Sequence, residues 1–200
     1  MKRKIALTVA LLVVGLGMIL SASAQSKRSL KGVNWKQRIE DARNGKIEID
    51  KDALARVEEA FAKKPETDVT FESNPNLTGT YFITVPGATP AEDFFAYWTL
   101  GSDGTFVETS SLLVTLTEGP AHGAYEKRGR GAILTFELFA FDPEAGAAVG
   151  RIRVRATIVS DRGNRISGFA FADFLDPDGT VIPLGGGPYS GEKIQVRQPD

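Results

Sequence analysis

Residues 132–160 decide the fold and read AILTFELFAF, DPEAG and AAVGRIRVRATIVS in succession. In the first and third of these segments apolar residues recur at every second position, which is typical of a half-buried β-strand. The middle segment begins with Asp142-Pro143 and ends with Gly146, residue types that favour a tight turn. The stretch therefore predicts an antiparallel hairpin of two long strands.

The apolar faces of this hairpin also predict its pairing register. If the two faces join, Phe136 lies near Val154, and Glu137 then lies opposite Arg153 on the outer face. Opposite charges at directly facing positions stabilise a strand pair. The alternating arginines of residues 151–155 are therefore interpreted as an exposed, partly neutralised face, because an anion site would need a wider basic surround.

Most of the chain after residue 76 shows the same period-two alternation, interrupted by turns. Gly101-Ser102-Asp103-Gly104 is one such turn between two strand-like runs, and an Asp-Gly pair there indicates a hairpin. Besides the hairpin above, strands are expected at 80–85, 94–100, 105–109, 112–117, 122–127, 165–175 and 192–197, with a weaker run at 181–184.

Eight or nine strands joined by short turns predict a mainly β fold. An open meander of this length would leave two exposed edges, and closure removes them. We therefore expect a closed antiparallel up-and-down barrel of about eight strands. A β-sandwich is the alternative, but its Greek-key crossovers are usually longer than these turns.

Three regions are expected along the chain: a signal peptide at 1–24, a polar arm at 25–75 and the barrel domain at 76–198. One helix is predicted in the arm, at 52–64, with Pro65 as its stop. Residues 25–64 of the arm are basic, with eleven basic and seven acidic side chains, whereas residues 65–126 contain nine acidic residues and no Lys or Arg. An arm lying across the acidic half of the barrel would follow from this segregation.

The segment 1–24 has the three parts of a secretory signal. Basic residues at 2–4 precede an uncharged apolar run at 5–20, and small residues ending at Ala24 suit a signal peptidase. Sixteen helical residues reach about 24 Å, less than the hydrocarbon core of about 30 Å, which disfavours the alternative of a membrane anchor. The sequence predicts an exported protein, periplasmic or extracellular, with no membrane span after cleavage.

Composition excludes several kinds of chemistry. The chain has 24 basic and 25 acidic residues, so its net charge gives no reason to expect nucleic-acid binding. It has no cysteine and a single histidine, His122, and it carries no nucleophile elbow or phosphate-binding loop. Asp176-Pro177-Asp178-Gly179 has calcium-loop spacing in part but is more simply a turn. No cofactor, no metal and no catalytic residue are predicted.

The candidate site consists of amphipathic and aromatic side chains on the predicted strands, because a ligand-binding barrel needs an apolar interior with a few polar groups. The ligand-binding candidates are His122, Tyr125, Asp173, Tyr97, Trp98, Phe136, Phe169 and Phe171. If the face of Phe169 and Phe171 points into the barrel, so does Asp173, and His122 or a tyrosine hydroxyl would then satisfy its carboxylate. The simpler interpretation is that the aromatic residues fill the core and backbone groups satisfy both polar residues.

Several segments together resemble a known group of proteins. Residues 77–81 (LTGTY), 102–105 (SDGT) and 122–125 (HGAY), with the hairpin above, are similar to uncharacterised bacterial exported proteins of the calycin and allene-oxide-cyclase-like type of small β-barrel. The resemblance covers about residues 76–197 and implies a barrel with an apolar cavity. No catalytic set of the plant cyclases matches, so cyclase activity is not implied.

We therefore expect an exported barrel that either binds a small apolar molecule or serves simply as a stable envelope protein. An isomerase-type enzyme with an acid–base residue in the barrel and an interaction module that uses the basic arm are the alternatives. The sequence does not indicate the oligomeric state.

Overall fold

The computed structural model describes residues 35–63, 76–86, 93–111, 118–142, 144–161 and 164–195. The predicted signal peptide at 1–24 and the strand expected at 112–117 lie outside these residues. Within the described part of the chain, no helix is long and apolar enough to cross a membrane.

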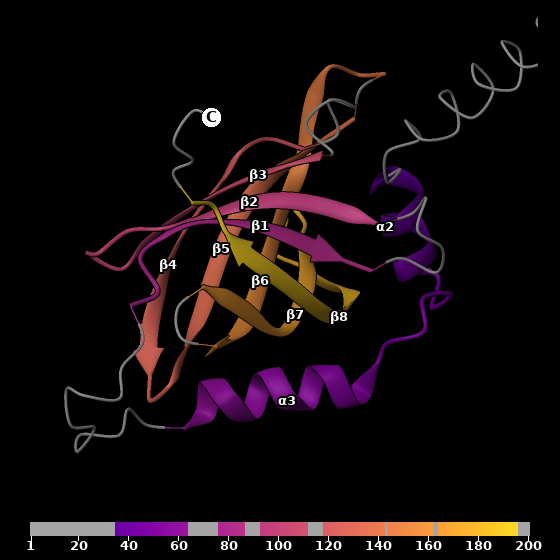
Figure 1. Ribbon diagram of the computed structural model, residues 1–200. Helices are drawn as coiled ribbons and strands as arrows, with labels where there is room; N and C mark the ends of the chain where they lie inside the picture. Colours follow the sequence, from indigo (N-terminus) through magenta and orange to yellow (C-terminus); the bar gives the residue numbers. More distant parts are fainter. Residues whose placement is uncertain are drawn as a thin grey trace, which may run out of the picture. The chain divides into compact units, whose positions relative to one another are not determined.

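The described residues form one closed antiparallel barrel of eight strands in sequence order (Figure 1). Every strand pairs with its neighbours in the chain, and β1 also pairs with β8 through residues 81–84 and 190–193. The prediction of an up-and-down barrel is confirmed. The strands are β1 (Gly79–Val85), β2 (Phe94–Leu100), β3 (Thr105–Ser110), β4 (Ala121–Arg128), β5 (Gly131–Asp142), β6 (Ala147–Asp161), β7 (Arg165–Leu175) and β8 (Val181–Lys193).

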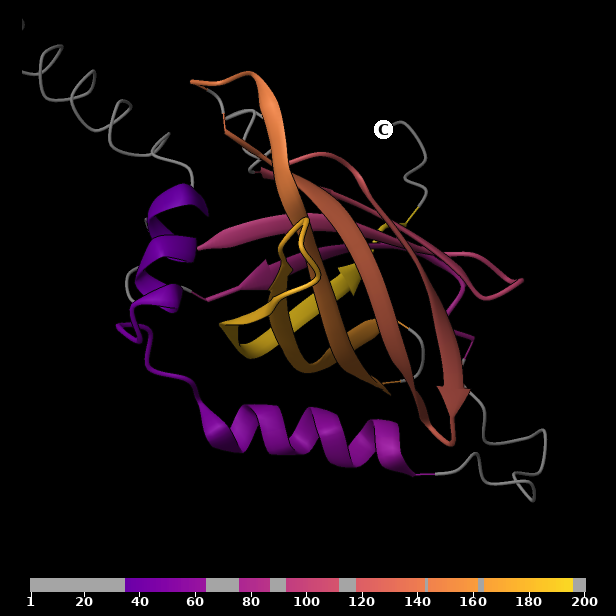
Figure 2. The ribbon, with the colours of Figure 1, turned by 180° about the vertical axis from the view of Figure 1, so that it is seen from behind.

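The long hairpin of β5 and β6, seen from behind in Figure 2, has the register that its apolar faces predict. Phe136 pairs with Val154, and Glu137 pairs with Arg153. The ion pair that Glu137 forms is nevertheless diagonal to this register. Glu137 accepts a hydrogen bond from Arg151 at 2.6 Å, while Arg153 turns to Asp173 on the other side.

The last strand differs from the expectation. The separate runs at 181–184 and 192–197 were expected to be two strands, but β8 is continuous from Val181 to Lys193 and includes the glycine-rich residues 185–188. Strand pairing uses only main-chain groups, so glycines can take part in it. A β-bulge accommodates the change of register beside Ala172, with Gly185 at φ 100.

Two helices, not one, lie in the described part of the arm. Helix α3 (Lys51–Ala62) confirms the predicted helix, whereas α2 (Trp35–Arg43) was not predicted. Most of their contacts are with β5 to β8, so the expectation that the arm covers the acidic half of the barrel is wrong for the part of the arm that the structure describes. Ile39 of α2 is buried in the main core, which explains why so polar a helix is held there.

The barrel has two different ends. At one end Tyr81 and Tyr125 are buried, and their hydroxyls donate hydrogen bonds to the carbonyls of Leu77 at 3.1 Å and Gly101 at 2.6 Å. At the other end, β1 ends at Val85, and among the described residues its pairing with β8 is confined to residues 190–193 of that strand. The second end is where the interior is hollow.

Candidate ligand-binding site

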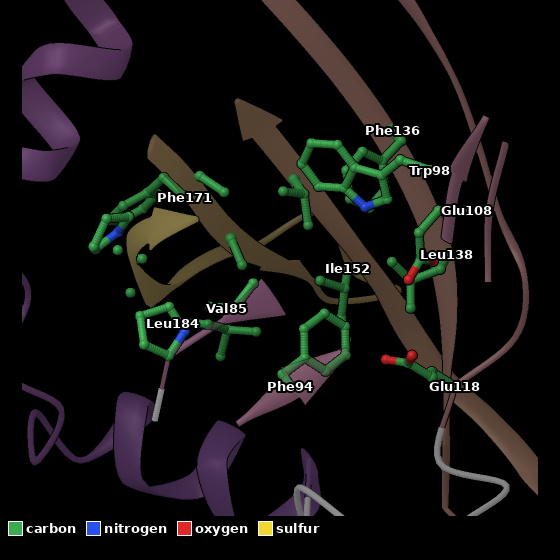
Figure 3. A pocket seen from close by; sticks show the side chains of 18 residues that line it. Val85, Phe94, Trp98, Glu108, Glu118, Phe136, Leu138, Ile152, Phe171 and Leu184 are labelled. Atoms are coloured by element: carbon green, nitrogen blue, oxygen red, sulfur yellow. The ribbon is translucent and has the colours of Figure 1, made fainter. Parts of the chain in front are cut away.

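A cavity of about 320 Å³ lies inside the barrel toward the second end (Figure 3). This volume falls within the range of about 300–1,000 Å³ that is usual for small-molecule sites. The side chains around it are mostly aliphatic or aromatic, with two carboxyl groups among them. The lining comprises Val85, Pro86, Phe94, Trp98, Glu108, Glu118, Phe136, Leu138, Ile152, Val154, Ala170, Phe171, Ala172, Gly185, Gly186, Gly187, Pro188 and Leu184.

The cavity exists because one wall of the barrel carries small residues. In the middle of β7, Ala170 and Ala172 pack against the core. Ala170 pairs with Gly187 of β8, and Ala172 pairs with Gly185. A Cβ atom added at Gly187 would meet no other atom within 4 Å. The space that larger side chains would fill on this wall is therefore left open.

Aromatic rings form the floor of the cavity. The ring centroid of Trp98 lies 5.5 Å from that of Phe106, 5.8 Å from that of Phe136 and 4.6 Å from that of Tyr189. Burial raises the pKa of the Tyr189 phenol, whose hydroxyl donates to the carbonyl of Thr157 at 2.8 Å. Of this cluster, Trp98 and Phe136 line the cavity, so they offer aromatic surface to a bound molecule.

Glu108 of β3 is the most unusual residue of the lining. Its side chain points into the barrel and only 3% of the residue is exposed. Its strand neighbours are Trp98 on β2 and Ala121 on β4, and within the described residues no hydrogen bond or ion pair reaches its carboxyl group. Burial raises the pKa of Glu108 from 4.5 to about 7, since a charge without a partner is disfavoured in an apolar site.

Glu118, which precedes β4, is the second carboxyl group of the lining. It is buried as well, but the hydroxyl of Ser110 donates a hydrogen bond to its Oε1 atom. Figure 3 shows the carboxyl groups of Glu108 and Glu118 on the same side of the cavity. The two acids therefore differ in that Glu118 has a donor and Glu108 has none in the described part of the chain.

Three of the sequence-predicted residues point into the barrel. Trp98 and Phe136 line the cavity, as a ligand site would require. Tyr125 is also buried, but it belongs to the closed end and is engaged by Gly101. The structure thus brings two of the eight candidates to the cavity with inward side chains.

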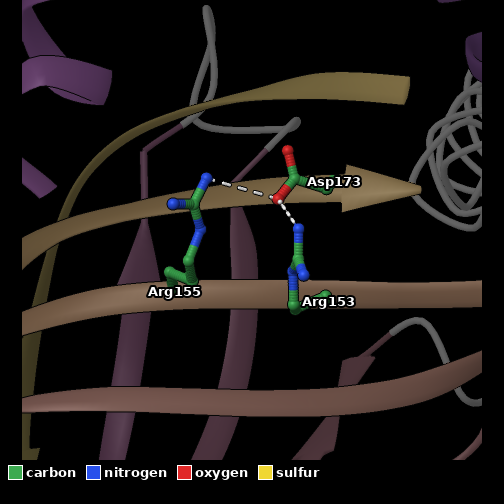
Figure 4. Close-up of polar contacts among 3 residues, drawn as sticks. All are labelled: Arg153, Arg155 and Asp173. Atoms are coloured by element: carbon green, nitrogen blue, oxygen red, sulfur yellow. Dashed lines mark hydrogen bonds and ion pairs between the residues drawn. The ribbon is translucent and has the colours of Figure 1, made fainter. Parts of the chain in front are cut away.

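Asp173 does not point inward, and the premise for placing it there is wrong. It pairs with Arg153, an outward residue, and its Oδ2 atom accepts hydrogen bonds from Arg153 at 2.9 Å and Arg155 at 3.3 Å (Figure 4). Phe169 and Phe171 share this outer side, because they alternate with the core-packed Ala170 and Ala172. The sequence predicts the opposite orientation, because Phe169 and Phe171 are larger apolar residues of β7 and are assigned to the inward face.

The outer phenylalanines are covered by the arm. The guanidinium of Arg56 in α3 lies 4.8 Å from the ring centroid of Phe169. Phe171 is 1% exposed and still borders the cavity. Two further candidates, His122 and Tyr97, lie on exposed outward positions and take no part in the cavity.

Sequence reasoning missed Glu108, although a signal for it was present. In residues 105–109 (TFVET), Phe106 is the natural inward residue, and the period of two then turns Glu108 inward as well. The residue was counted only as part of an acidic segment. The small wall of β7 and β8 could not be found in this way, since it depends on which strands are neighbours.

The described residues contain no group of three or more side chains suited to hold a metal ion. No family model, curated protein or solved structure matches the chain. The site is therefore interpreted from its own geometry. It is a cavity inside the barrel, bounded on one side by aromatic rings, and no described residue is a partner of its Glu108 carboxyl group.

Proposed function

We propose that this protein binds a small, largely apolar molecule in the cavity of its barrel. The observation that carries the proposal is the wall of Ala170, Ala172, Gly185 and Gly187, which leaves open space where a filled core would have larger side chains. An empty apolar cavity is destabilising, because its lining loses packing contacts. A hollow of this size is consistent with selection for an occupant.

Native mass spectrometry of the mature protein recovered from its own host's envelope tests this proposal. We expect a discrete excess mass that is lost on denaturation. The variant Gly187→Leu should abolish it, since a side chain at this position projects into open space. Ser190→Leu is the matched control, because it adds the same side chain to the exposed outer face of β8.

Three results would count against ligand binding in the barrel. The first is a bare mass for the native protein, and the second is an excess mass that Gly187→Leu retains. The third is an equal loss in the Ser190→Leu control, which would show that the added leucine disturbs β8 itself. A loss confined to Gly187→Leu supports the cavity.

Glu108 favours a second candidate function, an enzyme that moves a proton on its ligand. A carboxyl group whose pKa is raised to about 7 is suited to accept or donate protons near neutral pH. The test is to incubate the released ligand with the protein in deuterated water. Exchange or isomerisation that the wild type catalyses and Glu108→Gln does not would favour the enzyme over the binding protein.

We further propose that the chain is exported and cleaved after Ala24. The basic, apolar and small-residue parts of segment 1–24 support this proposal. The measurement is the intact mass of the protein from its native source together with its N-terminal sequence. A chain that begins at Gln25 is expected, and a chain that retains the apolar run of residues 5–20 would contradict cleavage.

A further inference from the structure

The charged groups among the described residues of the cavity are all of one sign. Of these residues, Glu108 and Glu118 are the ionisable side chains, and none is Lys, Arg or His. Glu118 is already engaged by Ser110. A ligand that enters this cavity therefore meets the Glu108 carboxyl group, to which no described residue donates, and meets no cationic side chain of the described lining.

No described residue donates a hydrogen bond to the Glu108 carboxyl group, and no described residue of the cavity lining is a cation. Trp98 and Ala121 flank it on the neighbouring strands, and apart from Glu118 the described side chains of the lining are aliphatic or aromatic. A buried carboxylate without hydrogen bonds is costly, and a cationic donor removes that cost most effectively. The position of Glu108 is thus complementary to a positive group on the ligand.

The aromatic floor adds to this preference. Trp98 and Phe136 lie in T-shaped contact at 5.8 Å, and both line the cavity together with Phe94. The faces of such rings attract cations, and a desolvated site strengthens the attraction. The same rings provide an apolar surface for the uncharged remainder of a ligand.

We propose that the cavity selects an apolar molecule that carries one protonated amine, and that Glu108 binds the ammonium group. This inference rests on the proposed function and specifies its ligand class. The apolar part occupies the space between the aromatic floor and the small wall of β7 and β8. The ammonium group lies at β3, where it donates a hydrogen bond to the Glu108 carboxylate.

Three probes of one skeleton test the assignment: 2-phenylethylamine, 2-phenylethanol and phenylacetate. Isothermal titration calorimetry of the full mature protein measures their affinities near neutral pH. We expect the amine to bind at least tenfold more tightly than the alcohol, and phenylacetate to bind more weakly than both. A charge-assisted hydrogen bond accounts for a difference of this size.

The variant Glu108→Gln keeps the shape of the side chain and removes its charge. It should lower the affinity for the amine at least tenfold and change the affinity for the alcohol less than threefold. Glu58→Gln, on an exposed position of α3, is the matched control and should change neither. Thermal unfolding of each variant checks that it is folded.

The outcomes separate this inference from the proposed function. Equal affinities for the amine and the alcohol in the wild type would overturn the ammonium site and leave an apolar binding cavity. An amine preference that Glu108→Gln retains would also overturn the role of Glu108. Binding of none of the three probes would contradict both the ammonium site and the cavity as a ligand site.

Discussion

Two regions of this molecule bury a carboxyl group to nearly the same degree. Asp173, on the outer side of β7, is 4% exposed, and Glu108, inside the barrel on β3, is 3% exposed. Asp173 accepts hydrogen bonds from two arginines of β6, whereas no described residue donates to the carboxyl of Glu108. The outer carboxylate is held in an ion-pair cluster, whereas the inner carboxyl group has no donor among the described residues.

The comparison teaches that burial alone does not mark a functional acid. A buried carboxylate with partners is an ordinary part of a structure, although its desolvation limits what it contributes to stability. A buried carboxyl group without partners is a cost that an evolved structure usually avoids. The missing partner, rather than the burial, directs attention to the cavity.

The largest expected effect comes from the titration of Glu108. Its pKa is raised to about 7 in the native protein, so between about pH 4.5 and 7 the native state keeps a proton that the unfolded chain releases. The free energy of unfolding therefore falls by on the order of 3 kcal/mol as the pH rises through this range, and it does not change further above it. Urea unfolding at several pH values in this range measures the free energy of unfolding of the wild type and of Glu108→Gln, and the pH dependence of their difference reports the titration of Glu108.

The difference in free energy of unfolding between wild type and Glu108→Gln removes the contribution of the other titrating groups, which both proteins share. Glu118 is the other titratable residue of the lining, and the flanking Trp98 and Ala121 do not titrate. Glu118→Gln provides the corresponding control, and it should retain the fall in stability. If the free-energy difference between wild type and Glu108→Gln were constant with pH, Glu108 would be a solvated acid and the comparison with Asp173 would fail.

A smaller effect is expected from the outer cluster. Asp173→Ala leaves Arg153 and Arg155 without their carboxylate, and the Nε atoms of both arginines are buried and unpaired already. The two arginine side chains are 32% and 23% exposed, so water compensates in part, and we expect a loss of about 2 kcal/mol. Urea unfolding near neutral pH measures it.

Asp161→Ala, at the exposed end of β6, is the control for Asp173→Ala. It should cost less than about 0.5 kcal/mol, as is usual for surface substitutions. Equal losses in the two variants would mean that the arginine cluster is effectively solvated. In that case the two buried acids would not differ in the way that their contacts indicate.

The fold could be predicted from the sequence to a large extent, and the candidate site only in part. Period-two alternation and turn residues are local signals, which is why the β5–β6 register, with Phe136 beside Val154, is confirmed. The orientation of β7 was wrong, because Phe169 and Phe171 are larger than the inward Ala170 and Ala172, and size suggested the opposite face. Arg56 of α3 covers the ring of Phe169, a tertiary contact that no local pattern contains.

The smallest expected effect tests whether the exposed ion pair of Arg151 contributes less to stability than the buried ion pairs of Arg153 and Arg155. Arg151 and Glu137 form an ion pair at 2.6 Å on the same outer surface as the Asp173 cluster, but their side chains are 53% and 37% exposed. Glu137→Gln should therefore cost less than about 0.5 kcal/mol in urea unfolding, and about 0.5 M salt should remove most of that loss. The loss in Asp173→Ala should persist at the same salt concentration, since buried pairs are screened much less. A salt-resistant loss of about 1 kcal/mol or more in Glu137→Gln would contradict the division, because the exposed pair and the buried cluster would then stabilise the barrel in the same way.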